Sequence, residues 1–179
     1  MPTHVALLRA VNLGPHNKIA MADLRALIGK LGLRDPQTLL NSGNVVFSEG
    51  KKSCSQVEQM LERGILQSLG METESFVRNA VEWSKIVDGN PFDREAKDDP
   101  GHLLLLALKG KPTAAAISAL KDAIKGRETF HVAGTHAYFV YPDGVGNSKL
   151  TVGLIERKLG TSVTGRNWNT VLKIRALLS

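Results

Sequence analysis

The chain has 179 residues, 42% of them hydrophobic and 22% charged, which is typical of a globular protein and excludes a disordered or fibrous chain. A single cysteine, Cys54, excludes an internal disulfide and a cysteine-based zinc site and fits a reducing compartment. The net charge is +6, and from Val145 to Ser179 six lysine and arginine residues stand against one glutamate, so this segment suits a phosphate-bearing partner or forms a solvated helix face.

The N-terminus, Met1-Pro2-Thr3-His4, lacks the basic region and the long apolar stretch of a secretory signal. The longest aliphatic run, Leu103 to Leu108, is far too short to cross a bilayer and predicts a buried strand. We therefore expect a cytoplasmic protein with no membrane partner.

The first part of the chain predicts a strand, a helix and a hairpin in that order. Apolar residues from 5 to 11 predict a largely buried strand, and helical spacing from 21 to 31 predicts a helix that Gly32 ends in a left-handed conformation. Asn41-Ser42-Gly43-Asn44 separates two short apolar runs, a pattern typical of a tight turn between paired strands.

A second helix and strand follow the hairpin. Ser53 and Gln56 form a capping-box pattern ahead of an apolar helical stripe, and Gly70 ends that helix. A strand through Phe76 comes next, and Asn79 begins a short helix that stops before Asn90-Pro91.

The order then repeats, starting with the strand at 102–108. We expect Pro112 to open a helix at its first position and Gly126 to end it. A second hairpin turns at Ala133-Gly134, and Ser148 is expected to cap the helix that Gly160 ends. A short strand near residue 163 and a last helix from Asn167 or Asn169 complete this half.

The repeated order predicts the α+β class, with duplicated ferredoxin-like βαββαβ halves and extra helices. We place the first half at residues 1–91 and the second at 102–179, with a linker at 92–101, and expect the two to form one compact unit. Residue identity between the halves is low, so the repeat is one of architecture.

Four segments together resemble one family: Leu7 to Gly14, Asn41 to Phe47, Gly146 to Leu150 and Arg166 to Val171. It is the uncharacterised, mainly bacterial family called domain of unknown function 1697, and the resemblance covers essentially the whole chain. The resemblance implies a duplicated ferredoxin-like fold. It implies no activity, cofactor or catalytic residue.

One candidate binding segment comprises Gly146, Asn147, Ser148 and Lys149. It combines a flexible turn, a capping hydroxyl and a lysine at the expected start of a helix, where free backbone N–H groups and the helix dipole favour a phosphate or a carboxylate. The Gly-Lys-Ser/Thr order of a nucleotide-binding P-loop is absent. A turn followed by an ordinary helix cap is the plainer explanation.

A second candidate comprises Arg166, Asn167, Trp168 and Asn169. A guanidinium, two amides and an indole suit a planar ligand that is stacked on its face and hydrogen-bonded at its edge. Alternatively, the indole belongs to the core and one asparagine caps the last helix.

Arg9 and Asn12, at the end of the first strand, join this site only if the two halves bring them together. The alternative is that Arg9 pairs with a carboxylate and Asn12 bonds its own loop.

Metal, cofactor and nucleophile chemistry find little support in the sequence. His131 and His136 are predicted to face each other across a hairpin, but a metal site needs a third ligand and none is spaced for it. Cys54 lacks the surroundings of a reactive thiol, so we expect it to be inert. Hydrolase, kinase and dinucleotide-binding signatures are absent, and we predict no cofactor.

The leading hypothesis is a binding module for a phosphate-bearing small molecule or a nucleic acid. The alternatives are an enzyme acting on a small anionic substrate and a structural or oligomerising protein. Sequence-specific RNA recognition is disfavoured, because Arg9 stands where such domains carry an aromatic residue and aromatic residues make up only 5% of the chain. The oligomeric state is left open.

Overall fold

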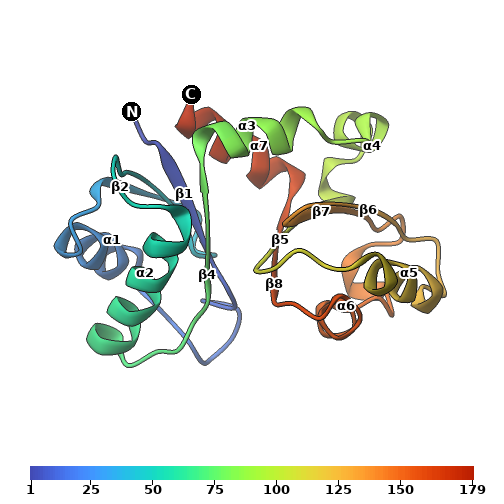
Figure 1. Ribbon diagram of the computed structural model, residues 1–179, viewed down its shortest axis with the longest axis horizontal. Coiled ribbons are helices and arrows are strands. Elements are labelled where there is room, and N and C mark those ends of the chain that lie inside the picture. Colours follow the sequence, from blue (N-terminus) through green and yellow to red (C-terminus); the bar gives the residue numbers. More distant parts are fainter. The chain divides into compact units, whose positions relative to one another are not determined.

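The computed structural model describes residues 1–179 and contains two antiparallel sheets of four strands each (Figure 1). The first sheet has the order β2-β3-β1-β4, with strands β1 (His4–Leu8), β2 (Arg34–Leu39), β3 (Asn44–Ser48) and β4 (Ser75–Asn79). The second has the order β6-β7-β5-β8, with strands β5 (Leu103–Leu108), β6 (Thr129–Ala133), β7 (His136–Val140) and β8 (Val163–Asn167). The predicted α+β class is confirmed.

The chain divides into two compact units. The first comprises Met1–Val87 together with Lys173–Ser179, and the second comprises Asp88–Leu172. Each unit contains one sheet and the helices packed on it. The stretch 92–101 carries the short helix α4 (Asp93–Asp98) and the start of a 3-10 turn, η1 (Pro100–His102).

In the first unit, helices α1 (Met21–Lys30) and α2 (Cys54–Leu69) cover the same face of the sheet (Figure 1). Ala6 and Leu8 point from β1 into a buried apolar cluster that both helices complete with leucine, isoleucine and valine side chains. The intervening residues of β1 point to the opposite face, because successive strand residues alternate. A third helix, α3 (Ala80–Asp88), directly follows β4.

In the second unit, α5 (Ala114–Ala123) and α6 (Val152–Leu159) likewise pack on one face of the sheet (Figure 1). Leu106 and Leu108 of β5 point into this helix-covered core, together with Phe139 of β7 and Ile155 of α6. A short 3-10 turn, η2 (Val145–Asn147), precedes α6, and α7 (Trp168–Leu178) directly follows β8. None of the helices has the length and apolar character needed to cross a membrane.

The duplication extends to strand register and to one short sequence motif. Val5 of β1 pairs with Arg78 of β4, and Leu105 of β5 pairs in the same way with Arg166 of β8. Both arginines are 9% exposed, and each donates from Nη1 to the carbonyl of the preceding residue at 2.8 Å. An Arg-Asn pair thus ends the last strand of each unit, a repeat that the sequence prediction missed.

Several predicted helix ends and turns are confirmed. Ser53 and Gln56 form the complete capping box of α2, and Gly70 ends that helix with a φ of 65°. Asn79 accepts a hydrogen bond from the Glu82 N–H at the start of α3. Both predicted hairpins form, with the glycines of their turns in the left-handed region.

Three predicted helix boundaries are wrong. Pro112 lies outside α5, because Thr113 is the N-cap and accepts a hydrogen bond from the Ala116 N–H. The helix ends at Ala123, before Gly126 can cap it, because Ile124 already has extended backbone angles. The third error concerns Ser148, since the N-cap of α6 is Thr151.

Candidate functional site

A cavity of about 360 Å³ lies beside the end of α5 in the second unit, and we call it the lysine cleft. Its walls come from the segment that follows α5, from the loop between β7 and α6, and from the first turn of α6. Apolar side chains form one part of the wall and charged or polar groups the other. The lining residues are Ala123, Ile124, Lys125, Gly126, Glu128, Asp143, Asn147, Lys149, Leu150 and Leu154.

Some charged side chains of the lysine cleft have a partner of opposite charge and others have none. Arg127 donates two hydrogen bonds to Asp143, and this contact holds the pKa of the Asp143 carboxyl below its ordinary value. Glu128 accepts a hydrogen bond from the Ser148 hydroxyl. Lys125 and Lys149 form no ion pair, so two ammonium groups face a cleft in which Glu128 is the only carboxylate without a cationic partner.

The loop that carries Lys149 is fixed by bonds at both of its ends. Tyr141 donates its buried hydroxyl proton to the Leu150 carbonyl at 3.0 Å, and burial raises the pKa of this tyrosine to about 12. Asn147 donates to the Asp143 carbonyl at 3.1 Å. Ser148 accepts from the Leu150 N–H at 3.0 Å. The loop therefore holds a defined conformation while the Lys149 side chain stays exposed.

The structure does not bring Arg166 and Trp168 to the lysine cleft. Arg166 is cross-strand neighbour to Leu105, which points to the face opposite the helices, whereas Leu150 of the cleft belongs to the core under α5 and α6. The sheet therefore lies between the two groups. Burial lowers the pKa of the Arg166 guanidinium to about 10, and this group donates to Thr164 Oγ1 at 3.0 Å.

The other residues of the second candidate segment have distinct surroundings. The Trp168 indole is 3% exposed and packs against Tyr138 with ring centroids 6.2 Å apart. Asn167 accepts a hydrogen bond from the Thr170 N–H at 3.0 Å, which makes it the cap of α7. Asn169 is exposed on the first turn of that helix. Core packing and capping thus account for Trp168 and Asn167.

Arg9 and Asn12 belong to the first unit, and both have local partners. Arg9 pairs with Glu74 at 2.8 Å beside a cavity of about 390 Å³. Asn12 has a φ of 56° and bonds both the N–H and the carbonyl of Ile19, as well as the Asn41 carbonyl. Asn12 therefore closes the loop that follows β1.

The histidines of the second hairpin do not face each other as predicted. His136 pairs with Ala133, and His131 pairs with Tyr138, because the turn is centred between residues 133 and 136. No group of three or more histidine, cysteine or carboxylate side chains is arranged to hold a metal ion.

Two polar centres of the first unit belong to loops and helix starts. Burial and the neighbouring Glu82 carboxylate raise the pKa of the Cys54 thiol to about 11, the opposite of what a nucleophilic cysteine needs.

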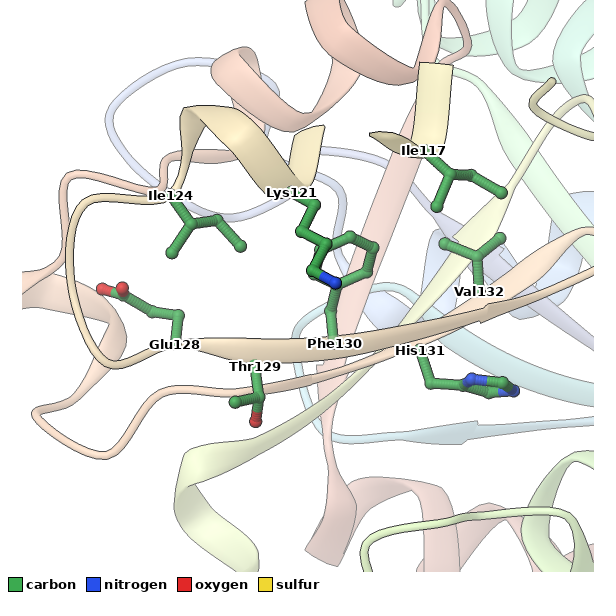
Figure 2. Close-up of a pocket in the computed structure, with 8 residues that line it drawn as sticks. All are labelled: Ile117, Lys121, Ile124, Glu128, Thr129, Phe130, His131 and Val132. Carbon is green, nitrogen blue, oxygen red and sulfur yellow. The ribbon is translucent and has the colours of Figure 1, made fainter. Parts of the chain in front are cut away.

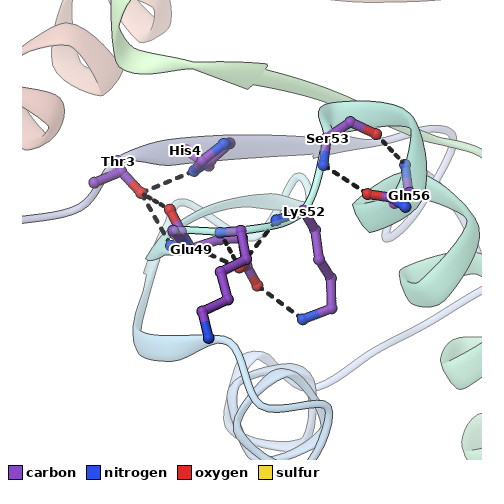
Figure 3. A network of polar contacts seen from close by, with 8 residues as sticks. Thr3, His4, Glu49, Lys52, Ser53 and Gln56 are labelled. Carbon is purple, nitrogen blue, oxygen red and sulfur yellow. Dashed lines mark hydrogen bonds and ion pairs between the residues drawn. The ribbon is translucent and has the colours of Figure 1, made fainter.

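Figure 3 shows Glu49 at the centre of a network that joins the β3 end to the start of α2. Three backbone N–H groups and Lys52 donate to its carboxylate, and the pKa of Glu49 falls to about 2.

Sequence reasoning missed Lys125 and Glu128 as members of a site. Both follow α5 in a segment that was interpreted only as a helix end. The signal that was available is the high density of charge from Lys121 to Glu128 at the end of an apolar helix. It does not reveal that Lys149, more than twenty residues away, lines the same cleft.

The structure defines a duplicated ferredoxin-like α+β protein whose second unit carries an amphipathic, lysine-lined cleft. The chain belongs to the family described as "Protein of unknown function (DUF1697)", whose model matches residues 1–138. This confirms the resemblance seen in the sequence.

A similar solved structure is described as "The structure of conserved bacterial protein SP0830 from Streptococcus pneumoniae". It shares 19% sequence identity with this chain at a TM-score of 0.78, and the match covers 99% of both chains. At this identity the similarity shows the fold alone. No curated protein matches the chain.

Proposed function

We propose that the protein binds a small phosphate-bearing molecule that also has an apolar part, and that the lysine cleft is its binding site. The main support for this proposal is that Lys125 and Lys149 line one cleft without an ion-pair partner. Asp143, the other charged group of the loop, is already paired with Arg127. Lysine ammonium groups are strong donors to phosphate oxygens.

The rest of the cleft wall supports an amphipathic ligand. Ile124 and Leu154, which are only partly buried, offer an apolar surface to a ring or a short chain, with the buried Leu150 behind them. The volume of about 360 Å³ falls at the lower end of the range of small-molecule sites. A nucleoside monophosphate has this combination, because the faces of its aromatic base are apolar and its phosphate is a dianionic group. The segment from Gly146 to Lys149 contributes through its lysine and through the amide of Asn147.

Isothermal titration with inorganic phosphate and with adenosine monophosphate tests the proposal. We expect saturable binding of the nucleotide, tighter than that of phosphate, because only the nucleotide covers the apolar wall. Lys149→Ala and Lys125→Ala should each weaken binding by roughly three- to tenfold. Lys158→Ala, which removes an exposed lysine of α6 outside the cleft, is the matched control.

Two results would overturn the proposal. The first is that neither ligand binds, or that both cleft variants bind as the parent does while remaining folded by circular dichroism. The second is that a short oligonucleotide binds with steep salt dependence and without sensitivity to Lys125 or Lys149, which would indicate a nucleic-acid surface elsewhere.

A further inference from the structure

The edge of the second sheet carries an open groove that adjoins the lysine cleft, with Ile124 and Glu128 in the wall of both, and the proposed function does not use the strand along its other side. A cavity of about 400 Å³ separates α5 from the edge strand β6, and we call it the α5–β6 groove. Figure 2 shows side chains of α5 and of the segment after it above the strand, and the apolar side chains of β6 pointing toward them. The lining residues are Ile117, Lys121, Ile124, Glu128, Thr129, Phe130, His131 and Val132.

The groove has an apolar wall and one free cation. Phe130 and Val132 are only partly buried against the core, and the Phe130 ring stacks on that of Phe139 with centroids 5.2 Å apart. Lys121 points from α5 toward β6 in Figure 2 and has no ion pair. Glu128 lies at the end of the groove with its carboxylate bound to the Ser148 hydroxyl.

The edge strand β6 lacks several of the features that protect an edge. Its sequence, from Thr129 to Ala133, contains no proline, no charged side chain and no bulge, and its alternate N–H and C=O groups point away from the sheet. Strands of this kind accept another strand by backbone hydrogen bonding.

The first unit shows what a protected edge looks like in the same fold. Its edge strand β2, the counterpart of β6, contains Arg34, Asp35 and Pro36, and its register shifts between Arg34 and Gln37. Helix α1 packs directly on β2, and Arg25 donates to Thr38 across that contact at 2.6 Å. Helix α5 packs less closely on β6 than α1 packs on β2, so the two copies of one architecture differ at this edge.

We propose that the α5–β6 groove binds an extended peptide segment with an acidic residue, which adds a strand to β6. The peptide backbone would pair with the strand edge, an apolar side chain would lie on Phe130 and Val132, and the carboxylate would meet Lys121. A second copy of this chain fits less well. The β6 strand of such a copy, from Thr129 to Ala133, carries no carboxylate that could meet Lys121.

The probes are two fluorescein-labelled peptides of about six residues that alternate valine with threonine, one with a central aspartate and one with a central lysine. Fluorescence polarisation against the full chain should show saturable binding of the aspartate peptide and weaker binding of the lysine peptide. Nuclear magnetic resonance should place the shifted amide signals on β6 and α5. The amides of β6 should also exchange more slowly with deuterium when the aspartate peptide is bound.

Charge reversal at Lys121 distinguishes specific binding in the groove from non-specific binding elsewhere on the protein. Lys121→Glu should weaken binding of the aspartate peptide by at least about fivefold and strengthen binding of the lysine peptide. The order of the two affinities should therefore reverse. Lys158→Glu makes the same charge change on α6, outside the groove, and should leave the order unchanged.

Three results would overturn the proposal: no binding of either peptide, an order of affinities that Lys121→Glu leaves as in the parent, or signal changes away from β6. Sedimentation of the protein without peptide supplies a fourth. If the protein forms a dimer, and Lys121→Glu changes its dissociation constant while the Lys158→Glu control does not, the groove binds a second copy of the chain. Adenosine monophosphate binding at the lysine cleft is measured separately, so failure here leaves the proposed function standing.

Discussion

The Glu49 network makes the sharpest stability prediction for the first unit. Glu49 Oε1 accepts hydrogen bonds from the backbone N–H groups of Gly50, Lys51 and Lys52 at 2.9, 2.8 and 3.2 Å, and Oε2 accepts from the Lys52 ammonium at 3.2 Å. These donors favour the ionised carboxylate and lower its pKa from 4.5 to about 2. Glu49→Gln keeps the shape of the side chain and removes this charge.

The pKa shift sets an upper limit on the effect. A fall from 4.5 to about 2 corresponds to at most about 3 kcal/mol of folding free energy. Solvent screens this surface loop, and the Lys52 contact is half-exposed, so we expect Glu49→Gln to lower the free energy of unfolding by about 1–2 kcal/mol near neutral pH. Part of this loss should shrink when salt is added, because the Lys52 contribution is ionic.

The dependence on pH follows from the direction of the shift. The folded state holds the Glu49 proton less tightly than the unfolded state, so the stabilisation is complete above the unfolded pKa of about 4.5. It is lost as the pH falls from there toward about 2, through the folded pKa. The difference between parent and variant should therefore be largest near neutral pH and should shrink across this acidic window.

Urea unfolding followed by circular dichroism at several pH values measures the effect. Glu72→Gln, which neutralises an exposed glutamate with no ion pair, is the matched control and should change little. The reasoning is refuted if Glu49→Gln and the parent have the same free energy of unfolding near neutral pH. It is also refuted if their free energies of unfolding differ by as much near pH 2 as near neutral pH. A direct check is the chemical shift of the Glu49 carboxyl carbon, which should not titrate until the pH approaches 2.

Three further outcomes are expected from local structure. Cys54 should react with iodoacetamide much more slowly in the native protein than in urea, because its thiol has a pKa of about 11. Gly43→Ala should lower the free energy of unfolding in urea by roughly 2–4 kcal/mol, because Gly43 has a φ of +80° and an added Cβ would lie 2.5 Å from a buried methyl carbon. Gly14→Ala is the control and should be nearly neutral, because a Cβ there meets nothing within 4 Å. Asn167→Ala should cost about 1 kcal/mol through the lost cap of α7, while the exposed Asn169→Ala should not.

Much of the fold could be predicted from the sequence because its signals are local. A capping box at Ser53 and Gln56 is read directly from two residues three positions apart, and the structure forms it. The left-handed glycines at helix ends and hairpins act in the same way, since no other residue adopts that conformation as cheaply. The order of strands and helices followed from these markers and from apolar periodicity.

The helix start near Ser148 shows where local signals stop being sufficient. Ser148 and Thr151 both precede the apolar residues of α6, and both side chains are good caps. The Ser148 hydroxyl is instead bonded to Glu128, twenty residues earlier in the chain, so Thr151 becomes the cap. A contact between distant segments decided between two equivalent local choices.

The candidate site was only partly accessible to sequence reasoning for the same cause. Lys149 was identified from its turn, but Lys125 joins it only through the packing of two loops on one face of the second sheet. Arg166 could have been separated from that face by strand alternation, because Gly165 lies next to it on the helix side against Leu106. The strand boundary was then too uncertain to apply this rule.

Comparison of the duplicated units gives a physical origin for the lysine cleft. Helix α2 of the first unit has 16 residues, whereas α6, at the same place in the order of elements, has only 8. A longer loop containing Asn147, Ser148 and Lys149 stands where the first unit begins its helix soon after β3. The shorter helix covers less of the core, and Leu150 and Leu154 remain at the wall of a cavity. The margin of the core that one unit closes with a long amphipathic helix is therefore only partly covered in the other, at Ile124 and Leu154, beside lysines that form no ion pair within the chain.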